Sequence, residues 1–207
     1  MNSDSPSKAR LRDRLRGATL TAILEAGESV FAEHGLHAAR MDTIAERAGV
    51  AVGTLYNYFA DRNALVTALI DSRRAELLER LDQVLDATER LPFREQLESF
   101  VTTFFQHMKS HKSFLAILME AESINIVTAK PKEAIRALWE RCERLTSRGV
   151  QAGALKADPN IDYADMLQGT LRAAFSRNRH FGKAVIPTHE RAVALADFFL
   201  FGAGKSL

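Results

Sequence analysis

Apolar residues recur at three- and four-residue spacing over most of the chain, and no segment shows the strict alternation of a surface strand. Pro92, Pro131, Pro159 and Pro187 each precede such a stretch, and proline is favoured in the first turn of a helix. The predicted helices cover about residues 11–34 (or 17–34), 41–48, 52–59, 62–85, 93–110, 113–125, 131–153, 160–179 and 187–201. The sequence therefore predicts an all-α fold, in which three short helices precede a larger helical part.

The composition is that of an ordinary globular protein, with 46% hydrophobic and 26% charged residues among 207. No apolar run is long enough to span a membrane, and the N-terminal residues lack the apolar stretch of a secretory signal. The single cysteine, Cys142, cannot form an internal disulfide, which fits a reducing compartment. We therefore expect a cytoplasmic protein that has no membrane partner.

Positive charge is concentrated at the N-terminus. Residues 1–16 contain five basic and two acidic side chains, whereas the whole chain has a net charge of only +2. This segment is interpreted either as a solvated, partly disordered tail or as a basic arm for an anionic polymer, and charge alone does not separate the two.

The segment from Met41 to Phe59 has the features of two short helices joined by a tight turn, which together form a helix-turn-helix. Ala45 is small where the second helix must cross the first, and Gly49 permits the positive φ that a sharp turn often needs. Leu55 supplies an apolar side chain to the face that the two helices bury. This pattern is the most informative feature of the sequence.

The second of these helices has distinct faces. At about 100° per residue, Val52, Leu55 and Phe59 share one face and are expected to pack inward. Tyr56 and Tyr58 fall on the two flanks, where each ring can pack against the protein while the hydroxyl points outward. A hydroxyl in that position can donate a hydrogen bond to a DNA phosphate.

The opposite face carries Gly53, Thr54 and Asn57. Glycine allows close backbone approach, and the two polar side chains can reach base edges in a major groove. The alternative is a helical protein-interaction module that does not bind DNA, but a partner helix would require an apolar stripe on this face. The pattern favours double-stranded DNA.

Residues 17–77 resemble the DNA-binding domain of the TetR family of bacterial transcriptional regulators, with the helix-turn-helix at about 40–59. The remaining residues, 78–207, resemble the family only in being helical and of suitable length. The matching residues are Ile23, Leu24, Ala26, Phe31, Ala32, Gly35, Ile44, Ala45, Ala48, Gly49, Val50, Gly53, Thr54, Leu55, Tyr56, Tyr58, Phe59, Arg62 and Leu65.

The resemblance implies a homodimer that binds a pseudo-palindromic operator and is released when a small molecule binds residues 78–207. It implies phosphate contacts for Tyr56, Tyr58 and Arg62, and positions at or near the bases for Val52, Gly53, Thr54 and Asn57. The set of predicted DNA contacts is completed by residues at the start of the 41–48 helix, which are Arg40, Asp42 and Thr43.

Two positions depart from the family pattern. Arg40 and Ala51 stand at the N-caps of the two helix-turn-helix helices, where family members usually have Ser or Thr. Loss of a capping side chain costs about 0.5–2 kcal/mol. Asp42, in the first turn, is expected to offset part of this loss through the helix dipole, and Arg40 could instead reach a phosphate.

Apolar and aromatic side chains on the later helices are explained mainly by core packing, but helices rich in Met and aromatic residues can also enclose a pocket. An apolar or aromatic effector is therefore expected there, with Arg136, Arg172 and Glu120 as candidates for a polar contact. The predicted pocket residues are Phe104, Met108, Phe114, Met119, Trp139, Cys142, Met166 and Phe175.

The last two helices combine small and bulky apolar residues, which suits either the core of a monomer or a dimer interface. We favour an interface, because two DNA-binding domains are needed to read two half-sites about 34–36 Å apart. The predicted interface residues are Leu167, Gly169, Leu171, Ala174, Leu195 and Phe199.

His107 and His111 stand four residues apart on a predicted helix, which is a possible metal-binding spacing. No third ligand has a clear place in the sequence, so these are interpreted as solvated or edge-of-core histidines. No metal, cofactor or catalytic residue is predicted. Because no Gly-rich phosphate loop and no recognisable Ser, His and Asp set is present, an enzyme is not expected.

Overall fold

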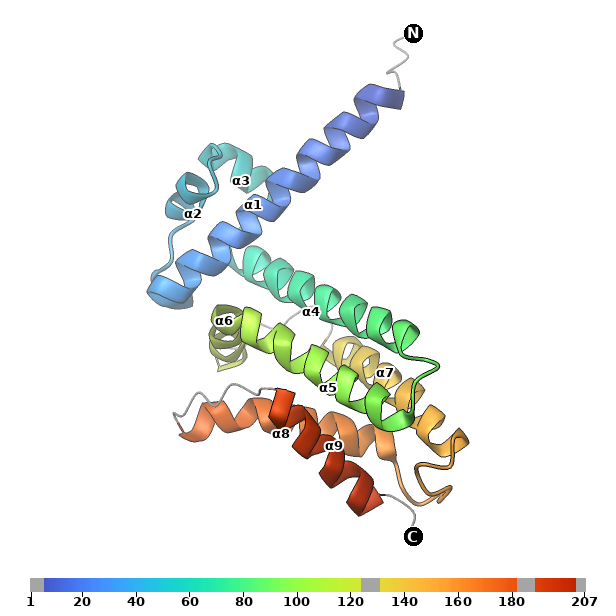
Figure 1. The fold of residues 1–207 in the computed structure, drawn as a ribbon. Helices are drawn as coiled ribbons and strands as arrows, with labels where there is room; N and C mark the ends of the chain where they lie inside the picture. Colours follow the sequence, from blue (N-terminus) through green and yellow to red (C-terminus); the bar gives the residue numbers. More distant parts are fainter. Residues whose placement is uncertain (1–5, 124–130, 182–188, 204–207) are drawn as a thin grey trace. The chain divides into compact units, whose positions relative to one another are not determined.

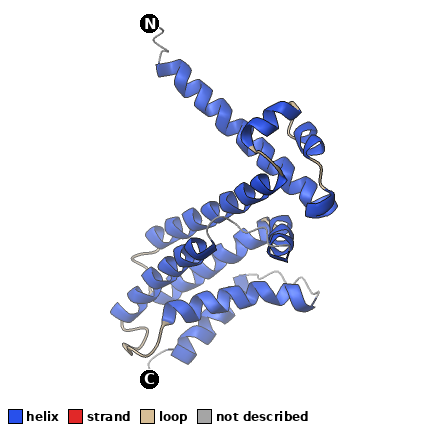
Figure 2. Ribbon diagram, turned by 180° about the vertical axis from the view of Figure 1, so that it is seen from behind, coloured by secondary structure: helices blue, strands red, loops and turns tan. Residues whose placement is uncertain are grey.

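The computed structural model describes residues 6–123, 131–181 and 189–203, and every regular element in these ranges is a helix (Figure 2). No helix among them is both long and apolar enough to cross a lipid bilayer. The helices are α1 (Pro6–Ala38), α2 (Met41–Arg47), α3 (Val52–Tyr58), α4 (Arg62–Ala87), α5 (Phe93–Ser110), α6 (Lys112–Ser123), α7 (Pro131–Gln151), α8 (Tyr163–Phe181) and α9 (His189–Ala203) (Figure 1). The all-α prediction is confirmed.

The chain forms two compact units. The first, called the head, comprises residues 1–73 and 112–129, and the second, called the body, comprises residues 74–111 and 130–207. This division differs from the predicted one at residue 77 in two respects: the units separate after Arg73, and α6 packs on α1 and belongs to the head. The reason is its apolar face, where Phe114, Ile117 and Ala121 are buried in the core of the head.

The head is built around α1, which begins at Pro6, so that residues 6–16 extend the helix. Its core is formed by apolar side chains from α1 to α4 and α6, including Ile23, Phe31, Ile44, Leu55, Leu65 and Leu69. Two ion pairs join other helices to α1: the Arg73 guanidinium lies 2.7 Å from a Glu28 carboxylate oxygen, and Arg47 lies 2.5 Å from Glu33. These contacts position α2 and α4 against α1.

The turn between α2 and α3 depends on Gly49, whose φ is 67°. Its N–H donates to the Glu46 carbonyl at 3.1 Å, and the Val50 N–H donates to the Ala45 carbonyl at 3.0 Å. This pair of hydrogen bonds is the Schellman arrangement, in which a residue in the left-handed region ends a helix. The prediction that Gly49 adopts a positive φ is confirmed, and the turn sets the direction of α3.

A kink near the end of α1 is stabilised by a contact with α6. Gly35 has φ 74° inside α1, and the N–H of Leu36 donates to both carboxylate oxygens of Glu120, at 3.0 and 3.1 Å. Glu120 was a candidate for effector contact in the sequence, whereas in the structure its carboxylate holds this kink. The kink is therefore stabilised by a residue that lies far away in sequence.

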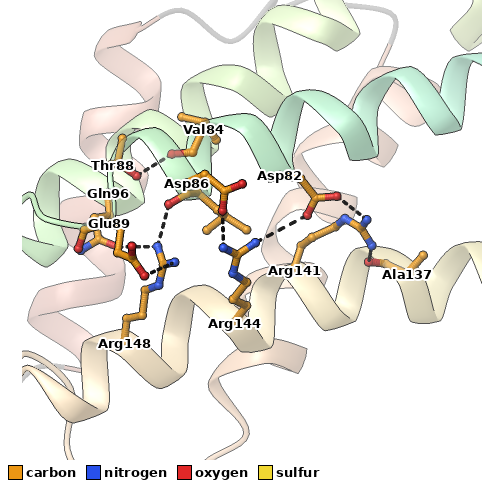
Figure 3. A network of polar contacts seen from close by, with 11 residues as sticks. Asp82, Val84, Asp86, Thr88, Glu89, Gln96, Ala137, Arg141, Arg144 and Arg148 are labelled. Atoms are coloured by element: carbon orange, nitrogen blue, oxygen red, sulfur yellow. Dashed lines mark hydrogen bonds and ion pairs between the residues drawn. The ribbon is translucent and has the colours of Figure 1, made fainter.

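The body packs α5, α7, α8 and α9 with the second half of α4 around an apolar core. Arg141, Arg144 and Arg148 on α7 form a ladder of polar contacts to the end of α4 (Figure 3). Their partners are Asp82 for Arg141, Asp86 for Arg144, and the Leu85 carbonyl and Glu89 for Arg148. These contacts hold α7 in a fixed register on α4.

Candidate nucleic-acid interface

The two faces of α3 differ in burial, as the sequence predicts. Leu55 is fully buried and Phe59 is 8% exposed, whereas Gly53 and Asn57 are exposed and Thr54 is half-buried. Val52 is 43% exposed, so the expectation that it packs inward is wrong. It is the first residue of a seven-residue helix, where its side chain lies beyond the edge of the core. The outer surface of α3 is thus formed by short side chains and one amide.

Two tyrosines flank this surface in different ways. Tyr56 is 50% exposed. Tyr58 is half-buried, its hydroxyl donates to the Arg16 carbonyl at 3.3 Å, and the Arg16 guanidinium lies 6.0 Å from the centre of its ring. Tyr58 therefore ties α3 to the N-terminal half of α1, while Tyr56 leaves its hydroxyl toward solvent.

Arg62 begins α4 beside Tyr56. Its Nη1 donates to the His37 carbonyl at 2.7 Å, which joins the start of α4 to the end of α1. Asp61 caps α4 by accepting the N–H of Ala64 at 2.8 Å. Around these groups lies a hollow of about 420 Å³, lined by Ala39, Met41, Tyr56, Ala60, Asp61, Arg62 and Asn63. Two of the predicted phosphate-contact residues, Tyr56 and Arg62, thus share one surface depression.

The start of α2 carries an ion pair. The Arg40 Nη2 lies 2.6 Å from Asp42, and both side chains are well exposed. The hydrogen bond from Arg40, followed by one from the Thr43 N–H, lowers the pKa of Asp42 to about 2. For Arg40 to contact a phosphate, its guanidinium would therefore have to leave the Asp42 carboxylate or bind the carboxylate and the phosphate at the same time.

Neither short helix has a side-chain cap. Arg40 precedes α2 and Ala51 precedes α3, both with extended backbone and with no side-chain hydrogen bond to the helix. The weak caps inferred from the sequence are therefore present in the structure. On α2, the Asp42 carboxylate accepts the Thr43 N–H at 2.8 Å, which satisfies one of the free N–H groups of the first turn.

The residues predicted for an effector pocket are not all in one place. Phe104, Met108, Trp139 and Cys142 lie in or against the core of the body, whereas Phe114 lies in the core of the head. Met166 is 53% exposed, and the side chains of Met119 and Phe175 lie outside the described residues.

Burial raises the pKa of the Cys142 thiol to about 12, so the thiol stays protonated at neutral pH.

The body also has a surface cavity of about 710 Å³ between α7 and the segment that leads into α8. Trp139 is the predicted pocket residue that lines it, together with polar groups such as Glu143, Lys156 and Asp158. Its lining is more polar than the sequence led us to expect for an effector site.

The predicted interface residues need correction. Leu167 and Leu171 are fully buried and Phe199 is 5% exposed, with its ring 6.1 Å from that of Tyr163, so these three belong to the core of one protomer. Leu195 packs partly against the same core, Gly169 is exposed, and the Ala174 side chain lies outside the described residues. Among the described side chains of α8 and α9, the large apolar residues that are exposed are instead Met166, Phe198 and Phe201.

The histidine pair gains a third neighbour that the sequence did not reveal. Glu76 on α4 lies 3.5 Å from the His111 Nε2, and His107 is buried beside them. Burial opposes ionisation of Glu76, but the hydrogen bond from Arg80 and the nearby imidazoles outweigh it and lower the pKa of Glu76. The sequence carried no local signal for this neighbour, because Glu76 lies on α4 and the histidines lie at the end of α5.

Comparison with known proteins gives consistent results. The family model described as "Bacterial regulatory proteins, tetR family" matches residues 23–69. The fatty acid metabolism regulator protein of Bacillus subtilis is 26% identical over 152 residues, which are 72% of this chain and 77% of that protein. The HTH-type transcriptional activator FasR of Mycolicibacterium smegmatis is 32% identical over 139 residues, which are 66% of this chain and 61% of that protein.

A solved structure is similar over almost the whole chain. The transcriptional regulator FadR from Bacillus subtilis, in complex with stearoyl-CoA, aligns with a TM-score of 0.63 at 21% identity. The alignment covers 87% of this chain and 95% of that one. At this identity the similarity establishes the fold, which is helical throughout.

Proposed function

The chain belongs to the TetR family of bacterial regulatory proteins, and we propose that it is a transcriptional repressor that leaves a pseudo-palindromic operator when a small molecule binds the body. Binding to DNA uses α2 and α3 of the head, with Thr54 and Asn57 toward the bases and Tyr56 and Arg62 toward phosphates. Its site of action is operator DNA in the cytoplasm.

The observation that carries this proposal is the division of α3. The core of the head uses Leu55 and Phe59, while Gly53 and Asn57 are exposed and take no part in that core. A glycine and an amide on an exposed recognition helix suit base edges, because one permits close approach and the other can pair with adenine N6 and N7. Tyr56 and Arg62 border the same surface.

The test is binding of the purified full chain to duplexes taken from DNA that flanks its own gene, measured by fluorescence anisotropy. We expect one duplex to bind at least about 10³-fold more tightly than a scrambled duplex of the same composition. The logarithm of the binding constant should fall steeply with the logarithm of salt concentration, because phosphate contacts release counterions. Equal, salt-insensitive binding to both duplexes would reject a DNA-binding function.

The effector is proposed to be an apolar molecule with a long acyl chain. Support comes from the apolar core of the body and from two matches in Bacillus subtilis, a protein named as a fatty acid metabolism regulator and a structure of FadR solved with stearoyl-CoA. Stearoyl-CoA should lower operator affinity, and the operator should lower stearoyl-CoA affinity by the same factor. Such coupling is typically worth about 1–3 kcal/mol. Binding of stearoyl-CoA that leaves operator affinity unchanged would exclude it as the effector.

A homodimer is proposed to present two heads to the two half-sites. Its interface is proposed to use the exposed residues Phe198 and Phe201 on α9 and Met166 and Gly169 on α8. An added Cβ on Gly169 would meet no atom within 4 Å in the protomer, so a partner helix can approach there.

Whether the protein represses or activates its target is tested by measuring reporter expression in the presence and absence of the chain. Increased expression in its presence would mean activation.

A further inference from the structure

A cluster of three potential metal ligands lies wholly within the body. It consists of Glu76 on α4 and of His107 and His111 at the end of α5, and one ligand atom from each lies within 4.8 Å of the others. The His111 Nε2 is 3.5 Å from the Glu76 Oε1, and the two imidazole rings are 4.6 Å apart between centres. These three side chains come from two helices and converge on one point.

We propose that Glu76, His107 and His111 bind one divalent transition-metal ion of the Zn²⁺ class. Imidazole nitrogens with a carboxylate oxygen suit Zn²⁺ and its first-row neighbours, whereas Mg²⁺ and Ca²⁺ prefer sites composed entirely of oxygen. Three protein ligands leave the fourth position of a tetrahedral ion to water. This site goes beyond the proposed binding of DNA and of an effector.

The burial of the three side chains supports such a site. His107 is fully buried, while the side chains of His111 and Glu76 are 15% and 30% exposed. The two partly exposed groups leave a route by which an ion and a water ligand can enter from solvent.

The helix register also suits an ion. His107 lies in the last turn of α5 and His111 is its C-cap residue, whose N–H donates to the His107 carbonyl. The two imidazoles therefore lie side by side four residues apart, which is the sequence spacing of histidine pairs that bind Zn²⁺ from one helix. With metal–ligand bonds of about 2.0–2.2 Å, the ligand atoms of a tetrahedral site lie about 3.4 Å apart. The observed separations therefore need side-chain rotations that bring the three groups closer, with no change of fold.

Arg80 competes for the same carboxylate. Its Nη2 lies 2.7 Å from the Glu76 Oε1, the oxygen that also faces His111. A metal ion must share Glu76 with this cation or displace it, so Arg80 should weaken binding through repulsion. Removal of Arg80 should therefore strengthen metal binding, an effect that a purely structural role of Glu76 and the histidines would not produce.

The test uses the full chain after treatment with a chelator, without DNA, so that its outcome is separate from that of the proposed function. Zn²⁺ is titrated against a chromophoric chelator, and Co²⁺ absorption reports the coordination geometry. We expect one ion per chain and a tetrahedral Co²⁺ spectrum. His111→Ala and Glu76→Gln should each weaken Zn²⁺ binding by more than about 100-fold, a larger loss than removal of a supporting residue causes.

Matched controls are the exposed histidines, through His34→Ala and His189→Ala, which should bind Zn²⁺ as the unmodified chain does. Arg80→Ala should bind more tightly. Circular dichroism without metal checks that each variant is folded, and His107 is left intact because its replacement would open the core. Slower amide exchange at residues 107–111 with Zn²⁺ would place the ion at the end of α5.

Three results with the variants would overturn the proposal. The first is unchanged Zn²⁺ binding in folded His111→Ala and Glu76→Gln, and the second is loss of Zn²⁺ binding in His34→Ala or His189→Ala. The third is that Arg80→Ala binds Zn²⁺ no more tightly than the unmodified chain does. Absence of Zn²⁺ binding by the unmodified chain would overturn it as well.

Discussion

The outer faces of α3 and α9 are both exposed but chemically opposite. On α3 the exposed residues are Val52, Gly53, Tyr56 and Asn57, of which Tyr56 and Asn57 carry polar groups, whereas on α9 they include Phe198 at 73% and Phe201 at 83% exposure. Water solvates a polar face, so α3 needs no permanent partner. A pair of exposed phenylalanines on one helix is costly in water and calls for a permanent apolar cover.

This difference separates two kinds of recognition on one chain. The α3 surface suits a partner that comes and goes, because its groups exchange hydrogen bonds with water for hydrogen bonds with bases. The α9 surface suits a partner that stays, and a second copy of the chain offers the same surface in a two-fold arrangement. The following changes test whether the two faces act independently.

The largest expected effect comes from adjacent phenylalanines on α9. Phe199→Asp should destabilise the body by at least about 3–5 kcal/mol, because it removes a buried ring that packs on Tyr163 and buries a charge. Phe198→Asp should leave the protomer folded and raise the dimer dissociation constant by at least about 30-fold, as for an interface hot spot of about 2 kcal/mol. Urea unfolding and analytical ultracentrifugation measure the two effects.

The contrast between the two variants is the control. If Phe198→Asp unfolds the protein, or if both variants remain dimeric, the division of α9 into a buried face and an interface face is wrong. If Phe198→Asp is monomeric yet still binds a full operator as tightly as the unmodified chain, the dimer is not required for DNA binding.

The same residues show what a single sequence can and cannot supply. In the helix-turn-helix, the helical spacing of apolar and polar residues correctly predicted the burial of Leu55 and Phe59 and the exposure of Asn57, but it wrongly placed Val52 inward. Near the end of α9, Phe198, Phe199, Leu200 and Phe201 are all apolar, so no periodic face could be distinguished. Which phenylalanine is buried depends on Tyr163, which lies on another helix.

Two helix starts were misplaced, because α8 begins at Tyr163 after an Asp162 cap and not directly after Pro159, and α1 begins at Pro6 and not at residue 11 or 17. The starts of α4, α5 and α7 were predictable, because Asp61, Pro92 and Pro131 mark them locally. The place of α6 in the head was not, because it depends on contacts between Phe114, Ile117 and the α1 core. Glu76 was missed as a neighbour of the histidines for the same reason. Local patterns gave the elements, and contacts between distant segments decided which residues form each site.

The second prediction sharpens the polar side of the comparison. Asn57→Ala should relax base preference at one or two operator positions by about 1–3 kcal/mol per lost contact, while binding to unrelated DNA stays nearly constant. The measurement is anisotropy with a series of operators that each carry one altered base pair. Asn160→Ala, the same change at an exposed residue of the body, should leave the series unchanged. An unaltered ranking and spread for Asn57→Ala would remove this residue from base contact.

The third prediction concerns the missing cap of α3. Ala51 is exposed and has the extended backbone (φ −65°, ψ 146°) of an N-cap residue. Its carbonyl already accepts the Thr54 N–H at 2.9 Å, so a serine hydroxyl at this position would accept the Gly53 N–H of the first turn. Ala51→Ser should stabilise the head by up to about 1 kcal/mol, visible as slower amide exchange over residues 52–58. Ala51→Val, which lacks an acceptor, should give no such protection. Equal exchange in the two variants would refute the capping argument.

The smallest expected effect is a pH dependence at the start of α2. The pKa of Asp42 is lowered to about 2 by hydrogen bonds from Arg40 and from the Thr43 N–H, so its ionised form stabilises the folded head. This contribution is present above the pKa of the unfolded chain, about 3.9, and is lost as the pH falls toward 2. The stability difference between the unmodified chain and Asp42→Asn should therefore be constant from pH 7 to about 5 and vanish near pH 2. An NMR titration of the Asp42 carboxyl with an ordinary midpoint would contradict the ion pair.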